Sequence, residues 1–147
     1  GDHRDLHVRS RRQRQMCIRD RNRYLLDRNT VWYTGKLDII KLNQVAELLI
    51  GQHDFQSFSK KSSQNENTIC NIYQSEWIEV GKIVNYHING NRFLHHMVRY
   101  LVGTMVAISQ RKYSVEQLIE RLDKPKVDSK QFRAPAYGLV LNRVFYD

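Results

Sequence analysis

Residues 91–110, which read NRFLHHMVRYLVGTMVAISQ, hold the chain's densest group of chemically capable side chains. The polar positions include Arg92, His95, His96 and Arg99. On an α-helix, Arg99 follows His95 by four residues and His96 by three, so these side chains would share one side. Cations on one surface can neutralise phosphates. The stretch therefore predicts a helix with an RNA-facing surface, although the same pattern also fits an ordinary solvent-exposed helix face.

Gly103 lies one turn beyond Arg99 on the same predicted face. A glycine inside a helix costs about 1 kcal/mol relative to alanine, so a packing or functional reason is expected. Without a side chain, this position would allow another chain segment or a base to approach closely.

Metal and thiol chemistry are not indicated. His95 and His96 are adjacent, and adjacent helical side chains diverge by about 100°. His53 and Asp54 have no fixed third ligand, and a zinc site commonly needs four. Two cysteines, Cys17 and Cys70, form no CxxC motif, and no histidine can be assigned to either as a base. We expect two unpaired thiols in a reducing cytoplasm and no membrane span, since no stretch approaches about 18 apolar residues.

The helix over 91–110 should begin at Asn91 as its N-cap and turn a broad apolar stripe to the core. A second helix should begin at Asp38, with apolar residues at helical spacing and a stop at Gly51. A third should begin at Ser114, whose spacing to Gln117 resembles a capping box, and end at Pro125. The apolar positions of these two helices are Leu42, Val45, Ala46, Leu49, Val115, Leu118, Ile119 and Leu122.

Four strands are expected, at residues 30–33, 69–80, 84–88 and 138–146. Gly81 and Lys82 predict a tight hairpin turn between the second and third. The last strand is apolar on both faces, which predicts a central position in a covered sheet. The predicted fold class is α+β: a mostly antiparallel sheet of about four strands with two to three helices packed on one face.

The chain has 147 residues and a net charge of +9, which favours a polyanionic partner such as nucleic acid. Residues 1–21 carry seven Arg and three Asp and show no apolar period. They could be a flexible basic arm or an irrelevant tail, but the run MCIRDR resembles translated sequencing-adapter sequence. We therefore expect 1–21 to be a non-native or disordered basic segment and 22–147 to be the folded domain.

Four stretches in order resemble the tRNA pseudouridine synthase A family. FLHHMVRYLVGTM resembles its helix signature, and LLIGQHDFQSFSK resembles its helix and turn. NTICNIYQSEWIEV and APAYGLVLNRVFY resemble its long strand and its terminal strand. The resemblance covers about residues 22–147 and implies the C-terminal α/β domain of a pseudouridine synthase.

The resemblance implies isomerisation of uridine to pseudouridine in the anticodon stem-loop of tRNA, without cofactor or metal. In that family an aspartate attacks the extruded nucleotide, and an arginine pairs with this aspartate; the matching residue is Arg99. The leucine after the terminal glycine lines the base pocket, and here it is Leu139. Arg92, His95, His96, Lys60 and Lys61 are candidate RNA contacts.

The family's Gly-Arg-Thr-Asp motif, which contains the nucleophile, has no match in this sequence, and Arg19-Asp20-Arg21 lacks its glycines and threonine. We therefore expect a fragment, inactive alone, that lacks its N-terminal catalytic half. The family implies a homodimer with tRNA as its partner and a cytoplasmic location. The alternatives are a stand-alone, non-catalytic RNA-binding module and a metabolic or structural α+β domain.

Overall fold

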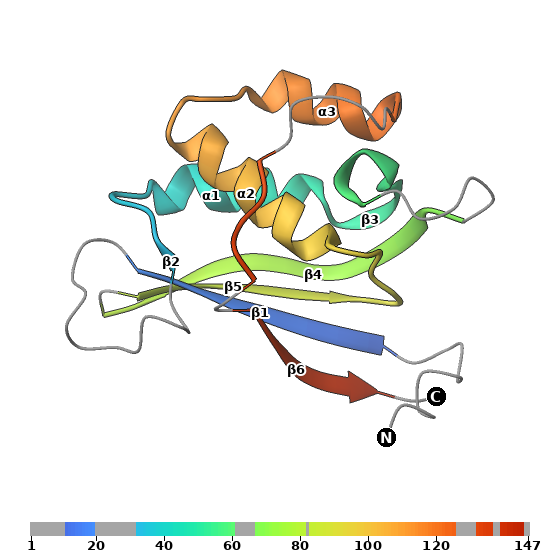
Figure 1. Cartoon of the computed structure of the whole chain (residues 1–147), viewed down its shortest axis with the longest axis horizontal. Helices are drawn as coiled ribbons and strands as arrows, with labels where there is room; N and C mark the ends of the chain where they lie inside the picture. The colour runs from blue at the N-terminus through green and yellow to red at the C-terminus, as the bar shows by residue number, and fades with distance from the viewer. Residues whose placement is uncertain are drawn as a thin grey trace.

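The computed structural model places three α-helices on one face of a β-sheet (Figure 1). It describes residues 11–19, 32–60, 67–81, 83–125, 132–136 and 139–145. The α+β class, the mostly antiparallel sheet and the single helical layer are confirmed. Among the described residues, no helix has the length and apolar character needed to cross a membrane.

Within the described residues the sheet has six strands rather than about four. They are β1 (Arg11–Arg19), β2 (Trp32–Tyr33), β3 (Gly51–Asp54), β4 (Ile69–Val80), β5 (Ile83–Gly90) and β6 (Leu139–Phe145). Their order is β2-β1-β5-β4-β3, and β6 also pairs with β1. All pairs are antiparallel except β1 with β2. The predicted hairpin is present, since β4 and β5 pair around Gly81, which has a φ of +61°.

Two strand expectations are wrong. Residues 51–54 were expected in a turn, but they pair with the start of β4, Gly51 opposite Ile72 and Asp54 opposite Ile69. The final strand was expected at the centre of a sheet, yet among the described strands β6 pairs only with β1. Apolar residues on both faces show that a strand is covered on both faces, and they carry no information about its neighbours in the sheet.

Residues 11–19 form β1, which pairs with β5 from Arg12 opposite Gly90 to Arg19 opposite Ile83. Strand pairing uses backbone groups, so a segment without apolar alternation can still occupy the free side of β5. Whether the gene encodes residues 1–21 stays a prediction, and resequencing the locus across this region would decide it.

Two of the three described helices begin at their predicted N-caps. α1 (Ile39–Leu48) begins after Asp38, whose Oδ1 accepts a hydrogen bond from the Lys41 amide at 3.1 Å. α3 (Val115–Asp123) begins with the predicted capping box of Ser114 and Gln117. The N-cap of α2 (Met97–Ser109) is His96, five residues later than expected, and a 3₁₀ turn spans Gln56–Phe58.

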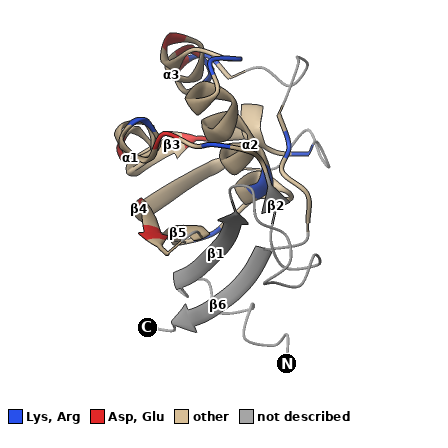
Figure 2. Cartoon of the chain, turned by 90° about the vertical axis from the view of Figure 1, so that its left-hand side faces the viewer, with Lys and Arg blue, Asp and Glu red and all other residues tan. Residues whose placement is uncertain are grey.

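The core lies between the helices and the sheet. The predicted apolar residues of α1, which are Leu42, Val45, Ala46 and Leu49, are all buried. On α3, Leu118 and Leu122 are buried, whereas Ile119 is 40% exposed. Trp77 of β4 and Tyr86 of β5 pack with ring centroids 4.9 Å apart beneath α2. Basic residues lie on α1 and α3, and acidic residues lie on α3 and at one end of β4 (Figure 2).

Candidate active site at the start of α2

The residues before α2 form a turn and not a helix. The Asn91 side chain accepts a hydrogen bond from the Asn71 amide at 2.8 Å, and the Asn91 amide donates to the Asn71 carbonyl at 3.0 Å. His96, the residue before the helix, has a φ of +62°. The left-handed conformation ends any helix that comes from its N-terminal side. The expected N-cap at Asn91 is therefore wrong, and Arg92, His95 and His96 do not form a helical stripe with Arg99.

Arg99 lies in the first turn of α2 and is held by the segment at residues 132–134. Its Nε donates to the Ala134 carbonyl at 2.8 Å, and the Ala134 amide donates to the Arg99 carbonyl at 3.0 Å. Burial lowers the pKa of Arg99, and the neighbouring charge of Arg133 lowers it further. Within the described ranges, no carboxylate pairs with Arg99. A partly desolvated guanidinium beside another cation favours the binding of an anion.

Gly103 allows residues 132–134 to pack closely against α2. A Cβ built on Gly103 would lie 2.4 Å from the Phe132 carbonyl oxygen and 2.9 Å from the Ala134 nitrogen. The expected packing reason for this glycine is thus confirmed, and the approaching segment belongs to the same chain. Because residues 132–134 cover Gly103, an RNA base cannot approach α2 at this position.

His95 and His96 stack on each other in the turn, with ring centroids 4.0 Å apart. His95 is exposed, whereas the Nδ1 atom of His96 is buried and has no hydrogen-bond partner among the described residues. The pKa of His96 is lowered, first by burial and then by the charges of His95, Arg99, Arg133 and Lys60. The Lys60 amide donates to the His95 carbonyl at 3.0 Å. The turn therefore gathers cations around a histidine that favours its neutral form.

Arg92 is tied to the backbone at the start of β4. Its Nη1 donates to the Asn67 carbonyl at 2.5 Å and to the Ile69 carbonyl at 3.3 Å. These bonds connect the turn to the sheet and give Arg92 a structural role. A contact of Arg92 with RNA stays a prediction.

A hollow of about 370 Å³ is lined by residues 93–99, so it brings His95, His96 and Arg99 together. Leu139 begins β6, where it is opposite Met16 of β1. The Leu139 side chain lies outside the described residues, as does all of Lys61. Sequence reasoning missed Arg133, although it directly precedes the APAYG stretch that resembles the family.

The described residues include no group of three or more His, Cys, Asp or Glu that could hold a metal ion. His53 and Asp54 have structural partners instead. The His53 ring bonds to the Ile50 carbonyl at 3.0 Å, and Asp54 Oδ1 accepts from Thr68 Oγ1 at 2.6 Å. Cys70 is buried, with its sulfur 3.9 Å from that of Met97.

Comparison with known proteins gives one consistent result. The family described as tRNA pseudouridine synthase matches residues 45–147. The tRNA pseudouridine synthase A of Borrelia duttonii is 34% identical over 142 residues, which are 96% of this chain and 58% of that protein. The tRNA pseudouridine synthase A of Chlorobium limicola is 38% identical over 76% of this chain and 46% of its own length. That of Staphylococcus aureus strain MRSA252 is 32% identical over 76% of this chain and 42% of its own length.

The chain thus spans about half the length of the relatives that it matches. The Borrelia alignment leaves about 4% of the chain outside it, so it includes most of residues 1–21. The origin of residues 1–21 stays a prediction.

Proposed function

Because the chain belongs to the tRNA pseudouridine synthase family, we propose that it is the C-terminal part of an enzyme that isomerises uridine to pseudouridine in the anticodon stem-loop of tRNA. One observation carries this proposal. Arg99 is fixed at its Nε and carbonyl by Ala134, carries a charge that is partly desolvated, and lacks a carboxylate partner within the described part of the chain.

In the proposed mechanism, the partner of Arg99 is an aspartate from the half of the enzyme that the relatives have in addition to this chain. The opposite charge of the guanidinium favours the ionised, nucleophilic form of that carboxylate and fixes its direction. The aspartate bonds to the extruded nucleotide as the base detaches and turns. The base then rejoins through carbon, which breaks the bond to the aspartate, and the proton of that carbon is replaced by one on the freed ring nitrogen. The bond broken and the bond formed lie in the same nucleotide, so no cofactor is needed.

The remaining residues are proposed to hold the RNA. Leu139 lines the pocket of the reacting base. His95, which is exposed on the turn, stacks on or bonds to the RNA near that base, and His96 supports it from beneath. Lys60, Lys61 and Arg92 contact phosphates around the hollow, with Arg92 the weakest contributor because its Nη1 is already bonded to two carbonyls.

The proposed assembly is the family's homodimer, completed by the N-terminal catalytic half. Such an enzyme works in the cytoplasm, where it meets tRNA. The isolated chain is inactive because the nucleophile is absent from it. The gene sequence immediately upstream should encode a Gly-Arg-Thr-Asp motif, and an unrelated upstream sequence would contradict the proposal.

An activity assay tests the role of Arg99. The full-length enzyme should form pseudouridine in the anticodon arm of a tRNA transcript, detected by primer extension after carbodiimide treatment. Its Arg99→Gln variant should lose at least 100-fold in rate, since removing an electrostatic contact to a reacting group costs about this factor or more. Lys124→Gln, which removes a cation that does not line the hollow at residues 93–99, is the control and should keep most of the activity. Measurable conversion by the isolated chain would show that the nucleophile has been wrongly assigned.

A further inference from the structure

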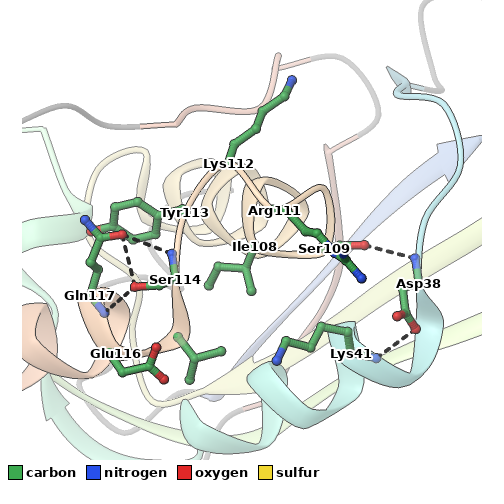
Figure 3. A pocket seen from close by; sticks show the side chains of 11 residues that line it. Asp38, Lys41, Ile108, Ser109, Arg111, Lys112, Tyr113, Ser114, Glu116 and Gln117 are labelled. Carbon is green, nitrogen blue, oxygen red and sulfur yellow. Dashed lines mark hydrogen bonds between the residues drawn. The ribbon is translucent and has the colours of Figure 1, made fainter.

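A second hollow lies at the other end of α2 from Arg99. It has a volume of about 570 Å³ and opens between the start of α1, the end of α2 and the start of α3 (Figure 3). Three cationic residues line it: Lys41 from α1, and Arg111 and Lys112 from the α2–α3 connection. The proposed isomerisation uses none of these residues.

The backbone fixes the two cations that follow α2. The Arg111 amide donates to the Ile108 carbonyl at 3.0 Å, and the Lys112 amide donates to the Ala107 carbonyl at 2.8 Å. Arg111 has a φ of +63°, at a helix end where glycine or asparagine is preferred. A strained backbone at a charged residue is a reason to look for a function of that charge.

Two acidic residues, Asp38 and Glu116, also line the hollow, so its three cations outnumber its carboxylates by one. Asp38 is used as the N-cap of α1, and Ser109 Oγ accepts from the Asp38 amide at 2.9 Å. Glu116 lies in the first turn of α3. Within the described parts of the chain, neither carboxylate forms an ion pair with Lys41, Arg111 or Lys112; the dashed line between Asp38 and Lys41 in Figure 3 is the cap bond from the Lys41 backbone amide. The amino end of α3 also faces the hollow and adds a partial positive charge.

We propose that this hollow binds a phosphate group of the RNA backbone, with Lys41, Arg111 and Lys112 as its cationic contacts. The proposal rests on the proposed function, which makes RNA the substrate. Along α2, Arg99 and the hollow are about 15–20 Å apart at 1.5 Å per residue. The phosphate bound here therefore belongs to a part of the RNA several nucleotides away from the reacting base. Such a contact adds affinity and fixes orientation without reading the sequence.

The test measures binding of the chain to a tRNA transcript by fluorescence anisotropy at several salt concentrations. In the Arg111→Asn/Lys112→Gln variant the slope of log K against log salt should become shallower by about 1–2, because each lost phosphate contact removes about one unit. At low salt the affinity should fall at least 5-fold. Lys124→Gln, a cation of α3 outside this hollow, is the control and should keep the wild-type slope.

Arg111→Asn alone separates binding from folding. Asparagine tolerates a positive φ better than arginine, so the single variant should have an unfolding midpoint at or above that of the wild type while its RNA affinity falls. If the wild type binds tRNA and both variants bind with the wild-type slope, the phosphate site is refuted and the proposed function stands. If the folded wild-type chain shows no salt-dependent tRNA binding, the phosphate site is refuted, and the activity of the full-length enzyme remains the separate test of the proposed function.

Discussion

At the scale of single residues, the Nε–H of Arg99 bonds to Ala134 while its charge has no carboxylate partner in the described part of the chain. Lysine would keep the positive charge, but it has no Nε–H group that could donate to Ala134 while a planar guanidinium binds an anion. Arg99→Lys should therefore lower the free energy of unfolding by about 1 kcal/mol, the usual contribution of one hydrogen bond. Urea denaturation of the isolated chain measures this loss, with Arg121→Lys as the control. A variant as stable as the wild type would show that the bond to Ala134 does not hold the side chain.

His96 gives a prediction about pH. Its pKa is lowered in the folded chain, so below pH 6.5 the unfolded chain binds more protons at this residue than the folded chain does. The contribution of His96 to stability is therefore present above about pH 6.5 and is lost as the pH falls below it. Asparagine accepts the left-handed backbone and does not titrate. The His96→Asn variant should lose less stability than the wild type between pH 7.5 and pH 5.5, as measured by thermal unfolding. Parallel curves for the two proteins would refute this.

At the scale of secondary structure elements, the contact of α2 with residues 132–134 depends on Gly103. Helix propensity alone would make Gly103→Ala stabilising by about 1 kcal/mol. Because the new methyl group would meet backbone atoms of Phe132 and Ala134, we expect the opposite sign, a destabilisation of about 1–3 kcal/mol. Denaturant unfolding measures the sign of this change in stability. Gln44→Ala, at an exposed position of α1, is the control and should be nearly neutral. A more stable Gly103→Ala chain would mean that the segment does not pack on α2 in solution.

Two neighbouring residues of α3 provide a matched pair. Leu118 is fully buried, and Ile119 is 40% exposed, although the apolar spacing assigned both to the core. Leu118→Ala should cost about 2–5 kcal/mol because it leaves a cavity, and Ile119→Ala should cost less than about 1 kcal/mol. Equal losses in urea unfolding would contradict the position of α3 on the core.

The sequence predicts those elements whose signals are local. Asp38 and Ser114 cap helices through residues three positions away, so α1 and α3 begin where their patterns indicate. The start of α2 was wrong because Leu94 is buried in a turn, and a turn that packs on the core looks periodic as well. The hydrogen bond from Arg99 to Ala134 joins residues that are 35 positions apart in the sequence, and no local sequence pattern encodes it. Arg99 was therefore predictable by resemblance, and its neighbour Arg133 was not.

At the scale of the whole molecule, the sheet ends in strands with one unpaired side. Among the described strands, β3 pairs only with β4, and β6 pairs only with β1. In the proposed enzyme, the half that is absent here covers part of this sheet. An open edge offers backbone donors and acceptors to any other strand, which favours association between chains.

The isolated chain should therefore associate as its concentration rises, and co-expression with the upstream half should suppress this. Light scattering coupled to size-exclusion chromatography measures both effects. Gln52 is exposed on β3, and a lysine there blocks edge pairing by charge. Association reduced by Gln52→Lys would locate the contact at β3, and association unchanged by it would locate the contact at the opposite side of the sheet, at β2 or β6. A chain that stays monomeric at high concentration would mean that neither edge is open, and that the missing half completes the site without extending the sheet.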